Sequence, residues 1–522
     1  MSSHDIEKSA MKDAPGVHAA APSIQEGGDG KASDVVADIV HAAEGEYTAA
    51  QYAKVLRRAD WILLPLMWIV SGTQYADKVS VSTQATFGLR TDTGLVGQQY
   101  SWLSSVFYIA YLLAEAPGNY LMQKVNIRYM VSISMLIWGV LVLCIAFCRN
   151  FAELMVVRTL QGIAECTTYP ALLVLTASWY TTEEHSSRVM VWGTANAGMD
   201  VITSLINYGI GMRAKQDPTG LAPWKGISLF LGSLTIVLSF IVYLVFGTPR
   251  EVRWLSAEEK RIAYARVVAS QTGSDAQERT QWRWDQVRAS FRDPQLYFVF
   301  FFVVINSIPN GGVTAFGNLV YVSFGFSSLD TIVKGKIPQQ LLSIAVFAAA
   351  GILTRKKANL RMYVAALSVV PSFAGMLGLA LLPKTGHLWT RWGVYFITSI
   401  GNVAAPMTWT LIPSNIAGRT KKSVISTVLL IAYCTGNTIG AQVFQEKDAP
   451  RYIPAIVVCS VMYGLQFVIL SIWRLYYIRQ NRKRDAMVRD LGMSAEEAEH
   501  QGRLNAESDM TDVENVHFRY NM

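Results

Sequence analysis

Charge is the first thing that this sequence lacks. Asp, Glu, Lys and Arg make up only 16% of its 522 residues, whereas a soluble domain carries about 25%. These few charged residues are also concentrated in three stretches, residues 1–60, 250–292 and 479–522. The long stretches between them are too poor in charge to be the surface of an ordinary soluble enzyme.

Cysteine is scarce, and glycosylation signals are missing. The five cysteines all lie in apolar stretches, which is typical of small buried residues and predicts no disulfide framework. The sequence has no N-x-[ST] sequon. Its polar stretches contain no metal-binding cluster, nucleophile motif or phosphate-binding loop. We therefore predict no metal, no cofactor and no enzymatic activity.

Long apolar runs fill the space between the charged stretches. Hydrophobic residues make up 51% of the chain, and the mean hydropathy is +0.26. Each run is close to the about 20 residues that a helix needs to cross a bilayer. We therefore predict an all-α membrane protein with twelve transmembrane helices, near 61–79, 99–121, 128–148, 151–175, 189–211, 226–246, 296–316, 337–354, 361–382, 391–411, 423–444 and 454–478.

Polar segments divide these helices into two halves of six. The chain is predicted to begin with a cytosolic disordered tail that ends in a short interfacial helix. The tail has no apolar core and is not a signal peptide. The predicted parts are this tail (1–60), the first six-helix half (61–246), a central, partly helical cytosolic loop (247–295), the second six-helix half (296–478) and a second cytosolic tail (479–522).

The net charge of +8 could indicate nucleic-acid binding. The basic residues, however, cluster at the ends of the apolar runs, where the positive-inside rule places them. We therefore predict no nucleic-acid partner, and both chain ends and the central loop on the cytosolic side.

Ionisable side chains within the predicted spans are candidates for function, because each costs about 2.5–3.5 kcal/mol on insertion scales. They lie almost entirely in the first half, which predicts that proton or ion coupling belongs there. The second half offers amides and the glycines Gly311, Gly312, Gly436 and Gly440, which allow close helix contacts. The candidates are Asp77, Lys78, Glu115, Arg158, Glu165 and Asp200, with the amides Asn310 and Asn437.

Arg158 and Glu165 lie seven residues apart, on one helix face and about 10 Å apart along the axis. Each therefore needs a partner on another helix, and we predict Glu115 as the partner of Arg158. The pair is either an anion-binding cation with a titratable carboxyl nearby, or a polar lock that holds helices together.

The other ionisable side chains also leave two interpretations open. Asp77 and Lys78 lie at the outer end of the first predicted span and are either part of a site or a solvated interfacial pair. Asp200 either faces a cavity, where it could bind a proton or a cationic group, or packs against a neighbouring helix.

Several motifs resemble a known family. Residues 158–162, Arg-Thr-Leu-Gln-Gly, resemble the R-x-x-Q-G element of major facilitator proteins, in which the Arg is associated with proton coupling. Residues 75–78, 115–119 and 414–422 (Tyr-Ala-Asp-Lys, Glu-Ala-Pro-Gly-Asn and Ser-Asn-Ile-Ala-Gly-Arg-Thr-Lys-Lys) resemble the fungal allantoate permease family of anion:cation symporters. The resemblance covers residues 47–485 and implies a major facilitator fold.

The resemblance also implies a function, the proton-coupled uptake of a small organic anion such as a carboxylate vitamin or an allantoate-like nitrogen compound. The two halves would rock about a central site. From the ionisable and amide side chains in the spans we predict substrate binding for Arg158, Lys78, Asn310 and Asn437, proton coupling for Glu115, Glu165, Asp77 and Asp200, and a cytosolic gate or structural role for Glu184, Arg188, Lys421 and Lys422.

Some residues depart from the family pattern and leave the substrate open. The loop from Gly118 to Arg128 lacks the acidic residue of the general G-x-L-x-D-R motif, and Arg419 stands where the family often has His. Residues 334–336, Lys-Gly-Lys, and Asp200 are also unusual.

The expected partners are an anionic small molecule, protons and the lipid bilayer, with the chain a monomer in the plasma membrane. Two alternatives remain open. One is export of a fungal metabolite by the same fold, and the other is a nutrient sensor on a transporter scaffold, which short tails without a recognisable domain do not favour.

Overall fold

The computed structural model describes residues 47–249, 251–271, 282–357, 359–383, 386–493, 497, 501–502, 505 and 509–522. The predicted disordered tail up to residue 46 lies outside the described residues, as does part of the central loop. The described residues are helical, with connecting turns and no strand.

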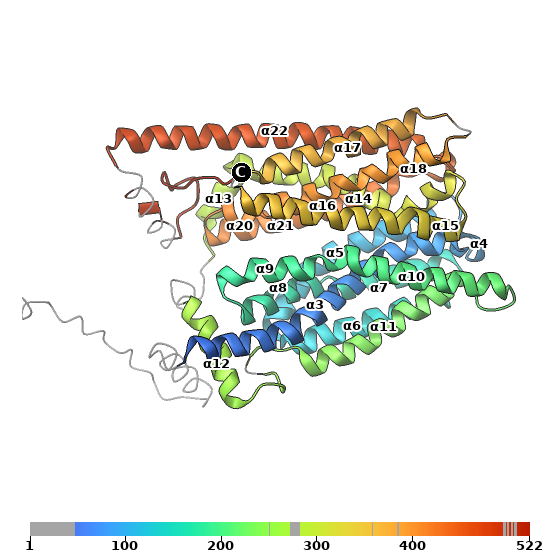
Figure 1. Ribbon diagram of the computed structural model, residues 1–522, viewed down its shortest axis with the longest axis horizontal. Helices are drawn as coiled ribbons and strands as arrows, with labels where there is room; N and C mark the ends of the chain where they lie inside the picture. Colours follow the sequence, from blue (N-terminus) through green and yellow to red (C-terminus); the bar gives the residue numbers. More distant parts are fainter. Residues whose placement is uncertain are drawn as a thin grey trace, which may run out of the picture. The chain divides into compact units, whose positions relative to one another are not determined.

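The helices before residue 247 form one group (Figure 1). Apart from the short α4, they overlap the first six predicted spans, and the fourth and fifth spans are each divided into two helices. They are α3 (Ala49–Thr86), the short α4 (Leu89–Asp92), α5 (Gln99–Lys124), α6 (Ile127–Ile145), α7 (Phe151–Glu165), α8 (Thr168–Trp179), α9 (Thr182–Gly193), α10 (Ala195–Gln216) and α11 (Pro223–Val245).

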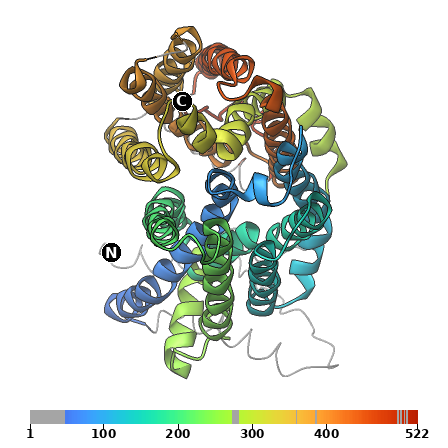
Figure 2. The ribbon, with the colours of Figure 1, turned by 90° about the vertical axis from the view of Figure 1, so that its right-hand side faces the viewer.

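The helices after residue 293 form the other group, as the end-on view in Figure 2 shows. Two linking helices, α12 (Ala257–Gln271) and α13 (Trp284–Arg292), come before them. The group contains α14 (Pro294–Ser323), α15 (Ser328–Asp330), the π-helical η1 (Thr331–Lys336), α16 (Ile337–Lys356), α17 (Arg361–Leu381), α18 (Leu388–Phe396), the 3₁₀ segment η2 (Ile397–Val403), α19 (Ala404–Trp409), α20 (Leu411–Asn415), α21 (Arg419–Val443), η3 (Glu446–Asp448) and α22 (Ile453–Asp490).

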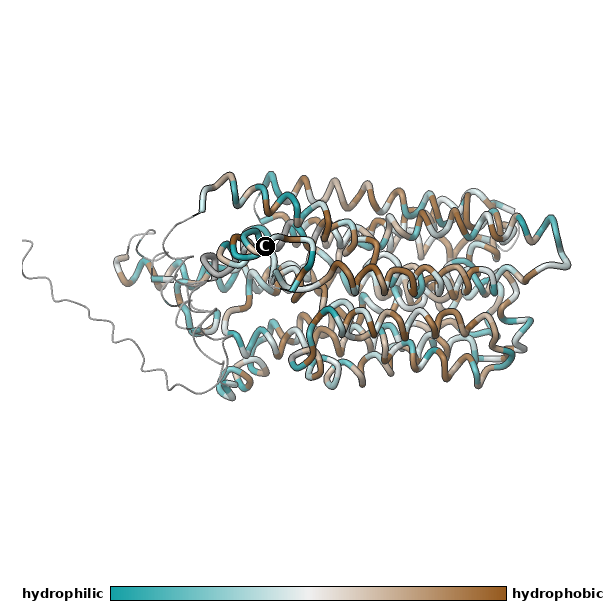
Figure 3. Tube along the Cα trace, turned by 90° about the horizontal axis from the view of Figure 1, so that it is seen from below, coloured by the Kyte–Doolittle hydropathy of each residue, from teal (hydrophilic) through white to brown (hydrophobic). Residues whose placement is uncertain are grey.

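Seven helices in the described residues are long and apolar enough to cross a membrane. They are α6, α11, α14, the combined 328–356 segment, α17, α21 and α22. Of the remaining predicted spans, those in α3, α5 and α10 carry polar and ionisable side chains, and those in α7–α8 and α18–α20 are interrupted. Figure 3 shows hydrophobic residues along the helices and hydrophilic ones concentrated at their ends.

The stretch before residue 61, predicted as a short interfacial helix that leads into the first span, is the start of a longer helix. Helix α3 runs unbroken from Ala49 to Thr86. Thr48 and Gln51 form a reciprocal capping box at its start, which satisfies N–H groups that would otherwise lack partners. Because no helix-breaking residue follows until Pro65, the helix continues straight into the first span.

The two ends of the bundle differ, and we name them for later use. The α4 end carries α4, α15 and η3, and the α12 end carries α12, α13 and the C-terminal residues 509–522 (Figure 1). One hydrophobic core lies within the first half and α12. A second core fills the second half and also takes in Leu89 and Tyr100 of the first half, so apolar packing joins the halves near the α4 end.

Backbone contact between α14 and α21 explains the glycines predicted to allow close packing. A Cβ at Gly311 would overlap the carbonyl of Asn437, and one at Gly440 would overlap the carbonyl of Ile308. Only glycine permits this approach, because it has no Cβ. The predicted close contact is confirmed at these positions.

The C-terminal residues 509–522 pack onto the second half at the α12 end instead of forming a free tail. Lys421 Nζ lies 2.5 Å from Asp293 Oδ2 and 2.8 Å from Asp512 Oδ1, and all three side chains are 0% exposed. Tyr520 donates a hydrogen bond of 2.9 Å to Asp512. This tail therefore supplies one of the two carboxylates that neutralise a fully buried lysine.

Replacing Asp512 with Asn removes one of these carboxylates while Asp293 remains. We expect the free energy of unfolding to fall by about 1–3 kcal/mol, seen as a lower melting temperature of the purified protein in detergent. The matched control is Asp490→Asn, which changes an exposed carboxylate at the end of α22. Equal melting temperatures for the two variants would contradict a structural role for the tail.

Candidate functional site

A polar cavity of about 90 Å³ lies between the halves, at the middle of the bundle. Helices α3 and α10 of the first half and α14, η1, α16, α18, η2 and α22 of the second half line it. Its polar and aromatic lining residues include Tyr75, Ser82, Asp200, Asn310, Asn318, Tyr321, Lys336, Gln339, Gln340, Tyr395, Asn402 and Tyr463.

An ion pair crosses this cavity from one half to the other. Lys336 Nζ of η1 lies 2.7 Å from Asp200 Oδ1 of α10, and the two side chains are 11% and 1% exposed. Gln340, one turn further along the second half, donates a hydrogen bond of 2.9 Å to Asp200 Oδ2. One carboxylate of the first half is thus held by a cation and an amide of the second half.

The local geometry of η1 brings Lys336 into this position. A Cβ at Gly335 would lie 3.0 Å from the ring of Tyr321, so the glycine lets η1 approach α14 closely. The segment is a π-helix, and such segments occur frequently at functional sites. The predicted eighth span begins at residue 337, which would leave Lys336 in an outer loop. The helix extends back to Ser328, and Lys336 therefore lies inside the bundle.

A second ion pair lies in the first half. Lys78 Nζ lies 2.7 Å from Glu165 Oε1, with side chains 19% and 0% exposed. The ammonium also lies 5.7 Å from the ring centres of Phe107 and Tyr111. Because α3 continues well beyond Lys78, this side chain is not at the end of a span. The interpretation of Lys78 as a solvated interfacial residue is wrong.

Arg158 does not pair with Glu115, contrary to the prediction. Its guanidinium donates a hydrogen bond of 2.9 Å to Gln161 and lies 5.1 Å from the ring centre of Phe107. Glu115 instead accepts a hydrogen bond of 3.2 Å from Asn119 on its own helix. The reason is spacing, since Phe107 and Glu115 are two helical turns apart on α5 and Arg158 reaches only the first.

The other predicted site residues divide between packing and the cavity. Asp77 is 1% exposed and accepts a hydrogen bond of 3.1 Å from Trp138, so it joins α3 to α6 and is not solvated. Asn437 is fully buried beneath Gly311 and donates to a carbonyl of its own helix. Of the four predicted substrate-binding residues, Asn310 lines the cavity.

The predicted gate residues lie at the α12 end. Glu184 is 2.8 Å from Arg266 of α12, and Arg188 is 3.1 Å from Asp60 of α3. Lys421 is the buried lysine beside the tail, and Lys422 is exposed. The ion pairs of Glu184, Arg188 and Lys421 join each half to a segment directly before or after it. None of these pairs crosses from one half to the other, which favours the structural interpretation.

The halves are held together at the α4 end. Arg90 of α4 lies 2.6 Å from Glu446 of η3. Asn318 donates a hydrogen bond of 2.8 Å to Thr83, and Tyr100 donates one of 2.6 Å to the carbonyl of Ala315. These contacts close the bundle between the cavity and the α4 end.

Comparison with known proteins agrees with this architecture. The sequence matches the Major Facilitator Superfamily over residues 67–441. The allantoate permease of Saccharomyces cerevisiae is 31% identical over 503 residues, covering 92% of this chain and 88% of that protein. An uncharacterised transporter of Schizosaccharomyces pombe is 30% identical over 495 residues, covering 94% of this chain and 92% of that protein.

A solved structure shares the fold. The crystal structure of a D-xylose–proton symporter superimposes with a TM-score of 0.61 at 11% identity, covering 78% of this chain and 97% of that chain. At this low identity the likeness concerns the fold alone.

The ion pair across the cavity makes a prediction about stability. Asp200→Asn leaves the buried Lys336 without its carboxylate, which we expect to lower the free energy of unfolding by about 3 kcal/mol. The double variant Asp200→Asn, Lys336→Gln removes both charges and should recover most of the loss. Thermal unfolding of the two single variants and the double variant measures this coupling. If the losses of Asp200→Asn and Lys336→Gln simply add in the double variant, the ion pair does not form in the protein.

Proposed function

Because this chain belongs to the major facilitator superfamily, and within it to the family of the fungal allantoate permease, we propose that it carries a small organic anion across the membrane together with a proton. The chain is a multi-pass membrane transporter of small molecules and not an enzyme. The anionic substrate, the proton and the direction of transport are the proposed parts, as is a location in the plasma membrane.

The observation that carries the proposal is the pair of Lys336 and Asp200 in the central cavity. A substrate carboxylate matches the chemistry of Asp200 and can replace it beside Lys336 and Gln340. The displaced Asp200 would then be a charge in a low-dielectric site with no partner, which burial disfavours. Taking up a proton removes that charge.

This exchange keeps the charge of the site balanced. Before binding, Lys336 and Asp200 sum to zero. After binding, the substrate carboxylate neutralises Lys336, and the protonated Asp200 is neutral. An anion without a proton would leave one uncompensated negative charge in the cavity, and such a charge is costly within a membrane. One monoanion and one proton would therefore move together.

The position of the pair also supports alternating access. Asp200 belongs to the first half, whereas Lys336 and Gln340 belong to the second. Rocking of the two halves about the cavity must weaken contacts that cross it. When the substrate binds to Lys336, the contact between Lys336 and Asp200 is lost. This loss removes a contact between the halves, which allows them to separate on that side of the cavity.

The other predicted residues keep supporting roles in this scheme. Asn310 lines the same cavity and is proposed to donate a hydrogen bond to the substrate. Lys78, Glu165 and Arg158 form a neighbouring charged cluster on α3 and α7, which remains the alternative place for the proton.

Substrate binding is tested by comparing two lysines of η1. Lys336→Gln removes the cavity cation, and Lys334→Gln removes an exposed cation that pairs with Asp330 on the same segment. We expect Lys336→Gln to lower uptake at least tenfold and Lys334→Gln to leave it unchanged. The measurement is uptake of radiolabelled allantoate, nicotinate, biotin and pantothenate in a transporter-deficient fungal host. Equal uptake by the two variants would contradict a role for Lys336 in substrate binding. Net efflux of the labelled anion would indicate that the protein is an exporter.

Proton coupling is tested in proteoliposomes with the anion that is taken up. Asp200→Asn cannot bind or release the proton, so an imposed pH gradient should no longer drive accumulation. Counterflow exchange needs no net proton movement and should persist at saturating anion. If Asp200→Asn still accumulates the anion and Glu165→Gln does not, the proton belongs to the Lys78–Glu165 cluster.

A further inference from the structure

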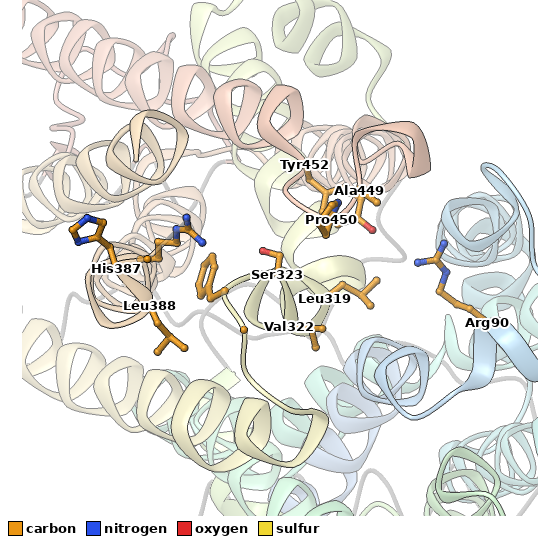
Figure 4. Close-up of a pocket in the computed structure, with 13 residues that line it drawn as sticks. Arg90, Leu319, Val322, Ser323, His387, Leu388, Ala449, Pro450 and Tyr452 are labelled. Atoms are coloured by element: carbon orange, nitrogen blue, oxygen red, sulfur yellow. The ribbon is translucent and has the colours of Figure 1, made fainter. Parts of the chain in front are cut away.

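A larger pocket, of about 590 Å³, opens at the α4 end (Figure 4). Arg90 reaches it from the first half, and Ser323, His387, Arg391 and Tyr452 line it from the second half. Among the described residues, its lining contains three side chains that can carry positive charge and no acidic one. This composition indicates an anion as the ligand, because a cleft lined by one sign of charge concentrates the opposite sign.

Arg391 has hydrogen-bonding capacity to spare. The residue is 5% exposed, and its guanidinium donates to the carbonyl of Pro383. Its buried Nε has no hydrogen-bond partner among the described residues. A guanidinium has five N–H donors, and a buried charge without a counter-ion is strongly unfavourable. The side chain of Arg391 is therefore suited to binding an anion.

The neighbouring charges strengthen this conclusion. Arg451 donates a hydrogen bond of 2.6 Å to the carbonyl of Leu382, and burial together with the nearby positive charge of Arg391 lowers the pKa of Arg451. Arg90 pairs with Glu446 at 2.6 Å, but its buried Nε also has no hydrogen-bond partner. In the part of the chain that the structure describes, Arg90 thus pairs with a carboxylate, whereas Arg391 and Arg451 donate hydrogen bonds to backbone carbonyls.

The pocket lies directly above the central cavity along two shared helices. On α14, Ser323 lines the pocket, whereas Asn318 and Tyr321 line the cavity. On α18, Arg391 lines the pocket, and Tyr395, one turn further, lines the cavity. The Tyr321 and Tyr395 rings, with centres 4.9 Å apart, form part of the partition between the two spaces.

We propose that this pocket is an outer binding site for a small organic carboxylate, held by Arg391 and Arg90 before it enters the central cavity. The inference rests on the proposed function, since it takes the α4 end as the outer side and the transported anion as the ligand. The guanidinium group of an arginine can bind a carboxylate through two parallel hydrogen bonds. A carboxylate bound here competes with Glu446 for Arg90, and so weakens the ion pair that joins the halves at this end.

The test measures this opening without measuring transport. Spin labels on Val96→Cys of the first half and Lys447→Cys of the second half, both at exposed residues close in sequence to Arg90 or Glu446, report the distance between the halves in the full-length protein. The protein is held in phosphatidylcholine nanodiscs and titrated with sodium nicotinate and, separately, sodium allantoate. We expect at least one of these anions to shift the distance distribution to longer values.

Matched variants decide whether Arg391 is responsible. Arg391→Gln should require at least tenfold more anion for the shift, and Arg149→Gln, which changes an exposed arginine outside the pocket, should behave like the parent. Glu446→Gln removes the competing carboxylate and should give the longer distance with no anion added, which tests the pair even if Arg391→Gln does not fold. A parent that shifts with neither anion, or an Arg391→Gln protein that shifts like the parent, overturns the proposal.

Two further results distinguish a soluble carboxylate from a lipid headgroup, and the outer site from the central one. If adding phosphatidylglycerol to the nanodiscs gives the shift without any soluble carboxylate, the ligand is a lipid headgroup and the proposal is overturned. If the shift depends on Arg391 but uptake does not depend on Lys336, the outer site stands and the proposed transport mechanism fails.

Discussion

A buried charge must have a partner, and in a membrane protein this requirement decides which helices touch. Lipid offers no water to solvate a lysine, so an inward-facing lysine needs a carboxylate from the protein. Lys421 has two, Asp293 and Asp512, and Lys336 and Lys78 each have one. In each case the partners come from different segments of the chain, and the ion pair therefore fixes how those segments are placed.

These pairs fall into two classes with different consequences. Lys421 with its carboxylates, and Arg188 with Asp60, join one half to segments directly before or after it, where they hold each half into a rigid unit. Lys336–Asp200 and Arg90–Glu446 cross from one half to the other. A transporter whose halves rock must keep the first class and break the second, so the cross-half pairs mark the places where binding of an anion can alter the balance between conformations.

Sequence patterns are sufficient for the all-helical fold and for the tightest helix contact, because both follow from local properties. Apolar runs predict the helices, of which seven in the described residues are long and apolar enough to cross a membrane, and the absence of side chains at Gly311 and Gly440 predicts close packing. Ion-pair partners could not be predicted, since they depend on which helices face each other. The sequence predicts Glu115 as the partner of Arg158, which contacts Gln161 and Phe107 instead. The sequence also predicts Lys336 in an outer loop, because the backward extension of its helix through a π-helical segment leaves no clear periodic signal.

The tail beside Lys421 has a consequence for the order in which the protein is made. Chains emerge from the ribosome with the N-terminal end first, and domains generally fold in that order. Asp512 follows α22 in the sequence, so Lys421 has only Asp293 as a carboxylate while that last helix is being inserted. In the first half, by contrast, Arg188 and Asp60 have both been synthesised before the second half begins. The second half can therefore finish its charge pairing only after all its helices have entered the membrane, which makes docking of the tail its last folding step.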